Sequence, residues 1–566
     1  MNAEDAIQRI ELTIQRESAR IASSFRVDAA NNIDSRIASL ELTRALNYAW
    51  WQTSVSRREQ DYLICTTMTR GFGTAMSLFV TPSHMEIVGV PNAPSSPESR
   101  EWADAVLTQL GLLRLARRVV DLFRAGLIEF VEGSSSKLRF QTIDDSGVGE
   151  DGDVAAHRWL SDLAISQDDA EYRDLQAQLP YIQCLLEANV WVYARHYIGY
   201  NTTPELDEYF HRLAILHARR SYGHEAFNHD AQFGGLPYAA FAAAAITLVG
   251  WALKHTAFAT ELSRMNPDLE IRNLLVPWST VQSKAQSLSL QLEIDREAAT
   301  QILRLFTGTP EFFNRSASVH DFPIPPLVPA ARDEVHFSVA SAQLLPYDLL
   351  LRRLREQYPQ DYFRNVDRRE ALFRDDLRQV LPMKRVHFAD KPVQLRHDSR
   401  SVTDVDAVAL SRDTGTLGLF QLKWQDPFGG DLRERRNRLA NMVPSANHWI
   451  QAVLDWLELH GPQALVNLAQ FKGVISQVHR VVLFVVGRYH CNFSQCRPDS
   501  RAVWCNWAQL LRAVDAGGLP GDPLVSLKDI IEGQRDQCRP PRGSIGNLHL
   551  RDFTIETCYP QPSEPR

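Results

Sequence analysis

Cysteine is scarce in this chain of 566 residues, and its seven cysteines are scattered. The odd count and the irregular spacing exclude a small disulfide-stapled secreted fold, and they favour a reducing compartment. Paired C-x2-C motifs are missing too, so a zinc-knuckle site is not expected. The acidic, amphipathic N-terminal stretch lacks the basic start and apolar block of a signal peptide. We therefore expect a cytoplasmic protein.

A strong excess of charge of either sign is also missing. The formal net charge is -7, and 23% of the residues are charged. This balance excludes a chain coated in basic charge for nucleic acid, although it leaves room for one basic face. The phosphate-binding pattern G-x4-G-K-[ST] does not occur, which excludes a built-in nucleotide-driven motor.

Long hydrophobic runs are rare. The most apolar stretch, residues 234–253, is rich in alanine, has no basic flank and is about as short as a membrane span can be. We predict a buried core helix there and no membrane partner.

Helical periodicity dominates the N-terminal half of the chain. The first ~50 residues, residues 102–131 and residues 155–306 are predicted to be mainly helical. Short strands are predicted between Asp61 and Val90, separated by Gly71, Gly73 and Pro82. The polar stretch 134–153 is predicted to be a loop.

Proline is concentrated in one segment, FPIPPLVPAA at residues 322–331. Each proline removes a hydrogen-bond donor and biases the preceding residue toward an extended backbone, so the segment is predicted to be a connector between domains. Four regions follow from this: an α+β region at 1–150, a helical region at 151–320, the connector at 321–345, and a C-terminal domain at 346–566.

The C-terminal domain shows a different pattern. A helix near 366–380 is followed by three strand-like segments, a long helix near 432–459 and the apolar strand VHRVVLFVV. The order α-β-β-β-α-β predicts an α/β fold with a mixed central sheet and helices on both faces. The fold class is therefore an α/β C-terminal domain joined to a large, mainly helical N-terminal region with a small β element.

Polar side chains interrupt two of these strands. Alternation places Asp404 and Asp406 on one face of a strand through Ser401–Leu410, and it places Gln421 and Lys423 together on the next strand. The turn around Asp413–Gly415 can close a hairpin between them. We expect Asp406, Gln421 and Lys423 to converge at one end of the sheet.

This set of side chains suits phosphodiester hydrolysis. The reaction needs a cation that neutralises the phosphate and lowers the pKa of the attacking water, and Mg²⁺ prefers a few hard oxygen ligands. Asp406 supplies an anionic oxygen and Gln421 a neutral one. The ammonium of Lys423 can orient the water or stabilise the transition state.

The motifs TDVDAVA and FQLKW resemble the active-site motifs of the PD-(D/E)XK, restriction-endonuclease-like nuclease superfamily. The Gln in Q-x-K is similar to the variant of Mrr-type restriction and phage-defence nucleases. The resemblance covers about residues 360–515, and the chain departs from the fuller pattern at Gln421 and in lacking a proline before Asp406. It implies an endonuclease that uses Mg²⁺, with Mn²⁺ as the alternative metal.

The superfamily often adds an acidic residue from the first core helix. Glu370 is the candidate, because it shares a helical stripe with Phe373, Leu377 and Val380 and so points inward. Its alternatives are Asp375 and Asp376 as the helix acid, or a salt bridge to Arg374 instead of metal binding. Asp404 is a further candidate ligand, with a solvent-exposed rim charge as the alternative.

Basic charge gathers beside these motifs. Residues 351–440 hold 19 Lys and Arg against 14 Asp and Glu, a net charge of +5, so the rest of the chain carries -12. Four arginines near the start of the long helix are the candidates for phosphate contacts, with a solvated helix face as the alternative. They are Arg433, Arg435, Arg436 and Arg438.

The sequence therefore predicts a metal-dependent endonuclease with DNA as the expected substrate. A large region fused to such a nuclease suggests a bacterial restriction or antiphage effector, in which residues 1–320 sense a partner protein or form a homo-oligomer. Two alternatives stay open. One is a non-catalytic nucleic-acid-binding or scaffold protein on a nuclease-like fold, and the other is a nuclease that cleaves RNA.

Overall fold

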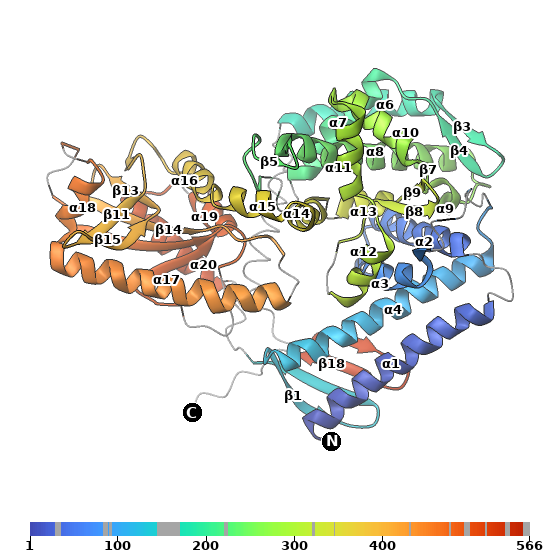
Figure 1. Ribbon diagram of the computed structural model, residues 1–566, viewed down its shortest axis with the longest axis horizontal. Helices are drawn as coiled ribbons and strands as arrows, with labels where there is room; N and C mark the ends of the chain where they lie inside the picture. The colour runs from blue at the N-terminus through green and yellow to red at the C-terminus, as the bar shows by residue number, and fades with distance from the viewer. Residues whose placement is uncertain are drawn as a thin grey trace.

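The computed structural model describes most of the chain (Figure 1). The described residues are 1–28, 35–82, 86, 89, 93–143, 170–219, 223, 225–319, 323–344, 346–428, 432–471, 473–474, 477–491, 498–515, 518–537 and 544–558.

Four long helices open the N-terminal body. They are α1 (Ala3–Asp28), α2 (Ser35–Ser56), α3 (Glu59–Phe79) and α4 (Pro97–Arg124). Ser96 caps α4, because its side chain accepts a hydrogen bond from the Ser99 amide, and a proline follows in the first turn. The prediction of helices in the first ~50 residues is confirmed for the described part. The helix predicted at 102–131 is confirmed up to Arg124, where α4 ends, but residues 128–131 belong to strand β1 (Ile128–Gly133).

The prediction of short strands between Asp61 and Val90 is wrong for the residues that the structure describes, because most of them form helix α3. Gly71 and Gly111 lie where α3 crosses α4, and a Cβ atom at either would collide with main-chain atoms of the other helix. The glycines of α3 therefore permit close helix packing and do not form turns. Tertiary contacts outweigh the strand preference of its threonines.

Helices also fill the middle of the N-terminal body, as predicted for residues 155–306 within the described part. Helix α8 (Tyr238–Met265) passes through its centre and is long and apolar enough to cross a membrane, but 56% of its most apolar window is buried inside the protein. The prediction of a buried core helix is confirmed. The other helices are α6 (Ala170–Ala188), α7 (Pro204–Arg219), α9 (Ile271–Leu274), α10 (Val281–Leu292), α11 (Arg296–Leu305), α12 (Pro310–Ser318), α13 (Val339–Leu344), α14 (Pro346–Gln357) and α15 (Pro359–Val366).

Two short β-hairpins lie between these helices along the chain. Two hairpins pair β3 (Val190–Tyr193) with β4 (Tyr197–Tyr200), and β5 (Gln232–Phe233) with β6 (Leu236–Pro237).

The proline-rich segment is extended, but it is not a linker. Its second half forms β8 (Leu327–Ala331), which is buried at every position. Strand β8 pairs with β9 (Glu334–Phe337), which in turn pairs with β7 (Trp278–Thr280). Prolines are tolerated here because β8 is an edge strand of this three-stranded sheet. The connector predicted at 321–345 is thus part of the core of the N-terminal body.

The C-terminal body is a mixed five-stranded sheet between helices. The sheet order is β10-β13-β14-β15-β16. Strand β13 is antiparallel to both β10 and β14, whereas β15 is parallel to both β14 and β16. The strands are β10 (Val386–Phe388), β13 (Ala407–Ser411), β14 (Thr416–Lys423), β15 (Arg480–Gly487) and β16 (Ala502–Asn506).

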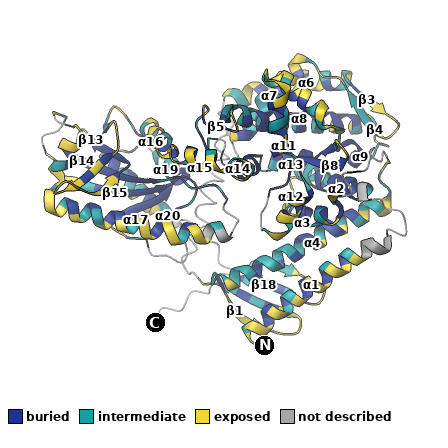
Figure 2. Cartoon of the chain, viewed as in Figure 1, coloured by how far each residue is buried: buried dark blue, intermediate teal, exposed yellow. Residues whose placement is uncertain are grey.

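Helices cover both faces of this sheet, as predicted (Figure 1). One apolar core lies between the sheet and α17 with α18, and a second lies between the sheet and α16, α19 and α20. Figure 2 shows that β14 and β15 are buried along most of their length. The helices are α16 (Arg369–Val380), α17 (Leu432–His460), α18 (Pro462–Leu468), α19 (Trp507–Asp515) and α20 (Pro523–Gln537).

The last strands of the chain return to the N-terminal body. Strands β17 (Ser544–His549) and β18 (Thr554–Cys558) join β1 (Ile128–Gly133) and β2 (Lys137–Thr142) in the order β1-β2-β18-β17. The C-terminal body therefore does not extend to residue 566 as predicted. Part of the loop predicted at 134–153 is strand β2. One hydrophobic core also runs through both predicted regions 1–150 and 151–320, so the structure does not separate them.

Candidate functional site

The hairpin predicted to carry the site is present, but its first strand is broken. Instead of one strand through Ser401–Leu410, the chain forms β12 (Arg400–Val405), which pairs with β11 (Val393–His397), and then β13 in the main sheet. Asp406 lies at the bend between them. Val405 and Val408 both face the core beneath α17, so side-chain alternation changes phase at the bend. Asp404 and Asp406 do not share one continuous strand face, contrary to the prediction.

The register of the hairpin places Asp406 next to Gln421. Ala407 is paired with Phe420, so one step outward the pair is Asp406 and Gln421. The side-chain amide Nε2 of Gln421 donates to Oδ2 of Asp406 at 2.5 Å, and the Leu422 amide donates to the same oxygen at 2.7 Å. Asp406 is 3% exposed and Gln421 is 6% exposed, so both side chains are buried, and a hydrogen bond joins them at the end of the hairpin strands.

The charges of Glu370, Asp404 and Lys423 influence the pKa of Asp406. The pKa of Asp406 is raised to about 6, mainly by burial and also by the carboxylates of Glu370 and Asp404, while the Leu422 amide and the Lys423 ammonium oppose this rise. Burial also raises the pKa of Glu370, and Lys423 lowers it. Three carboxylates and one ammonium therefore interact around the end of β14.

Among the acids of α16, Glu370 is the one whose charge interacts with Asp406 and Lys423, although the residue is exposed and does not point inward as predicted. The Asp376 carboxylate instead binds Arg488 at 2.6 Å, and that of Asp375 lies 3.5 Å from Arg378. The two alternative acids are thus engaged elsewhere. Arg374 donates to the main-chain oxygen of Asp406 at 3.3 Å, and its charge lowers the pKa of Glu370. Helix α16 is therefore tied to the bend that carries Asp406.

The oxygen donors fit a hard divalent cation. Within the described ranges no three His, Cys, Asp or Glu side chains are close enough to surround a metal ion together. Mg²⁺ takes only one or two protein carboxylates and keeps several waters, so the number and type of the oxygen donors on Asp406 and Glu370 are compatible with it. Gln421 here presents its NH2 group to Asp406, and a half-turn about its terminal bond would present the carbonyl oxygen instead.

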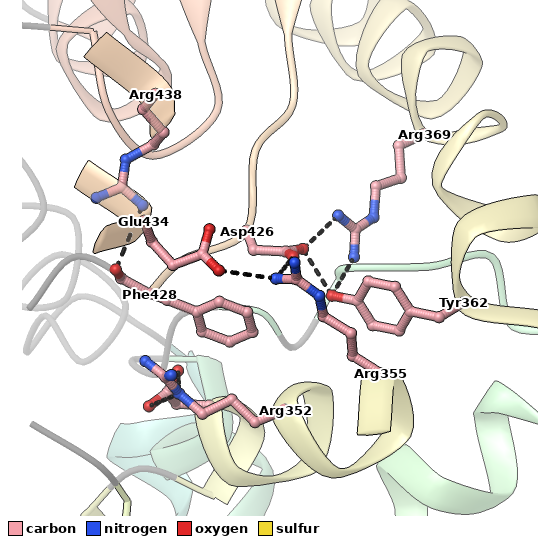
Figure 3. Close-up of polar contacts among 9 residues, drawn as sticks. Arg352, Arg355, Tyr362, Arg369, Asp426, Phe428, Glu434 and Arg438 are labelled. Carbon is pink, nitrogen blue, oxygen red and sulfur yellow. Dashed lines mark hydrogen bonds and ion pairs between the residues drawn. The ribbon is translucent and has the colours of Figure 1, made fainter. Parts of the chain in front are cut away.

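The four candidate phosphate-binding arginines have different surroundings. The side chains of Arg433 and Arg435 lie outside the described residues. Arg436 is exposed, and one guanidinium nitrogen lies 3.5 Å from the Arg124 carbonyl oxygen. Arg438 is 8% exposed and donates to the Phe428 carbonyl oxygen at 3.3 Å, so its prediction as a surface phosphate ligand is wrong (Figure 3).

One residue that fixes the site was missed from the sequence. The main-chain amide of Arg488 donates to the Lys423 carbonyl oxygen at 2.8 Å, and its guanidinium lies 4.5 Å from the centre of the Trp424 ring. An arginine directly after the apolar strand β15 was the available signal, because a charged residue at the end of a buried strand needs a partner.

The raised pKa of Asp406 predicts that replacing this buried carboxylate by a neutral amide stabilises the protein above neutral pH. A carboxyl with a pKa of about 6 when folded, and about 3.9 when unfolded, binds a proton on folding between these values, so stability decreases as the pH rises through that window. Asp406→Asn cannot ionise, and its oxygen can still accept from Leu422. We expect it to raise the free energy of unfolding by about 2 kcal/mol at pH 8, and by much less at pH 4.

Urea denaturation without divalent metal at both pH values measures this difference. Asp375→Asn is the matched control, because that carboxylate lies on helix α16 of the same C-terminal body and is 58% exposed, so its effect should be small at both pH values. Destabilisation by Asp406→Asn at pH 8 would contradict the assignment of a raised pKa.

Comparisons with models of protein families, with curated proteins and with solved structures found no match to this chain.

Proposed function

We propose that this protein is a metal-dependent endonuclease that hydrolyses phosphodiester bonds, with DNA as its substrate. The observation that supports the proposal is the hydrogen bond from Gln421 to Asp406 at the end of the β13–β14 hairpin, together with the charge interactions of Asp406 with Lys423 and Glu370. The mixed sheet between helices agrees with the fold that the sequence resemblance implies. The combination of these four residues favours a nuclease more than any one of them does.

Each residue has a distinct role in the proposed site. Asp406, when ionised, holds the cation, and Glu370 shares this task from helix α16. Gln421 in its present orientation neutralises part of the Asp406 charge, and after turning it adds a neutral oxygen. A bound divalent cation supplies charge neutralisation and a lowered pKa of water. Lys423 lies within electrostatic reach of both carboxylates, where its ammonium can hold the phosphate.

The proposed chemistry depends on pH through Asp406. Metal binding requires the ionised carboxylate, whereas burial favours the protonated form up to a pH of about 6. Cleavage should therefore increase as the pH rises through 6. Repulsion among the carboxylates adds to the effect of burial on these pKa values, and a bound cation would relieve it, which favours metal binding above that pH.

The N-terminal body is proposed to regulate this nuclease, as in a cytoplasmic restriction or antiphage effector. That assignment rests on architecture alone, since a large helical body is joined to one compact α/β body.

A cleavage assay tests the proposal. Supercoiled plasmid, single-stranded DNA and RNA are each incubated with the full chain and millimolar Mg²⁺ or Mn²⁺, and the chelator-treated protein is the control. We expect nicking or linearisation of plasmid, loss of activity on chelation, and recovery when metal is returned. Preferential cleavage of RNA would support the alternative substrate.

A specific observation favours the non-catalytic alternative, namely that Gln421 donates to Asp406 and so satisfies it without metal. A test of metal binding distinguishes a nuclease from a non-catalytic binding or scaffold protein. A nuclease should show a higher unfolding temperature in Mg²⁺, because a ligand that binds only the folded state stabilises it. If no metal raises the unfolding temperature and no substrate is cut, the binding or scaffold function replaces the nuclease.

A further inference from the structure

The loop that follows Lys423 enters the N-terminal body (Figure 3). Asp426 accepts a hydrogen bond from the Tyr362 hydroxyl at 2.7 Å, and its carboxylate binds the Arg369 guanidinium at 2.6 Å. Phe428 packs beneath the guanidinium of Arg352, which lies 4.1 Å from the ring centre. Strand β14, which carries Gln421 and Lys423, is thus attached to residues outside the sheet by the contacts of Asp426 and Phe428, a few residues beyond its end.

Arg369 joins three parts of the molecule. It begins helix α16 directly before Glu370, and besides Asp426 it binds the Ala226 carbonyl oxygen through Nε at 2.8 Å. Its guanidinium also lies 4.1 Å from the centre of the Phe227 ring. The side chain is 2% exposed, so these partners replace water entirely. The helix end that carries Glu370 is therefore held by residues 226 and 227 of the N-terminal body.

Arg488 makes a second, parallel connection. Its guanidinium binds Glu225 at 3.1 Å and Asp376 of helix α16 at 2.6 Å, while its main-chain amide holds the Lys423 carbonyl. The guanidinium also stacks over the Trp424 ring. One short segment, Glu225–Phe227, thereby contacts both arginines that support the two sides of the site.

We infer that the segment Glu225–Phe227 controls the geometry of the site through Arg369 and Arg488, so that a displacement of the N-terminal body changes where Lys423 and Glu370 stand. The inference rests on the proposed function for its consequence, but the coupling itself is a property of the structure. Arg369 and Arg488 are positioning residues, because they act through the strand end and the helix end. The segment is linked to the site by one ion pair, between Glu225 and Arg488, and by one hydrogen bond, from Arg369 to the Ala226 carbonyl oxygen, and each of these contacts is either formed or broken.

Hydrogen exchange of the full chain without metal or substrate tests the coupling. In Glu225→Gln, the amides of residues 369–376 and 421–428 should exchange roughly tenfold faster, because local opening becomes easier once Arg488 loses one of its two charged partners, the one in the N-terminal body. Tyr362→Phe removes one hydrogen bond to Asp426 and keeps the ring, so it should affect 421–428 in the same direction. Under turnover, Glu225→Gln should lower kcat by roughly ten- to a hundredfold with a smaller change in KM.

Asp104→Asn is the matched control. It breaks an ion pair of 2.6 Å to Arg272, a guanidinium that is similarly buried and also stacks over a ring, but one that lies within the N-terminal body. Exchange at 369–376 and 421–428 should stay unchanged in this variant. Unchanged exchange in both Glu225→Gln and Tyr362→Phe overturns the coupling even if cleavage is established, whereas faster exchange in a protein that cuts nothing retains it and rejects only the nuclease.

Discussion

Replacing Lys423 by methionine should reduce plasmid cleavage by about 10²–10³-fold, which is the usual cost of removing one group that stabilises developing charge in a transition state. Methionine keeps most of the apolar stem but removes the ammonium. Lys423 lies within electrostatic reach of Asp406 and Glu370, so its charge acts where the scissile phosphate would be held. We expect the loss in kcat, measured from single-turnover plasmid nicking in Mg²⁺, while the unfolding midpoint changes little.

Lys528→Met is the matched control for this variant. Lys528 lies on α20 with its ammonium 4.0 Å from Glu532 at an exposed position, so its loss should leave cleavage within a factor of two or so of the parent. Activity of Lys423→Met equal to that of the control would remove Lys423 from the site, and the Q-x-K interpretation of the sequence would have to be abandoned.

Alanine at Gly111 should destabilise the N-terminal body by about 3 kcal/mol, near the upper end of the usual cost of overpacking. The added Cβ would collide with the Thr67 carbonyl of α3, and a main-chain atom cannot move aside as a flexible side chain can. Helices α3 and α4 must then separate, which loosens the core that they share with α1 and α2. Urea denaturation followed by circular dichroism measures the change.

The same substitution at Gly533 is the control. Gly533 lies in helix α20 with open space around it, so Gly533→Ala should be neutral or stabilising by up to about 1 kcal/mol. If Gly111→Ala proves as harmless as Gly533→Ala, the close crossing of α3 and α4 does not exist, and the explanation given for the glycines of α3 fails.

The hairpin that carries the site could be predicted because its signals are local. The turn at Gly415 joins two successive strand-like segments, which favours a hairpin, and the structure pairs β13 with β14 antiparallel as predicted. The inward position predicted for Glu370 from its helical stripe is wrong, because the residue is exposed in the structure.

Other features had no local signal. The glycines of α3 suit a turn as well as a helix crossing, and only the position of α4 decides between them. Strand β18 pairs with β2, whose residues precede it by more than 400 positions, and no period within either segment encodes that partner. The prolines of β8 indicate an extended backbone, but its burial depends on β9 and the surrounding helices.

The sequence by itself determined that Gln421 and Lys423 lie two residues apart on a strand whose hairpin partner begins directly after Asp406, because a short turn pairs two successive strands. Only the tertiary structure decided the bend at Asp406, the raised pKa of its carboxyl and the fastening of the site to Glu225–Phe227. These properties depend on burial and on partners that are distant along the chain, and desolvation has no counterpart in a linear pattern.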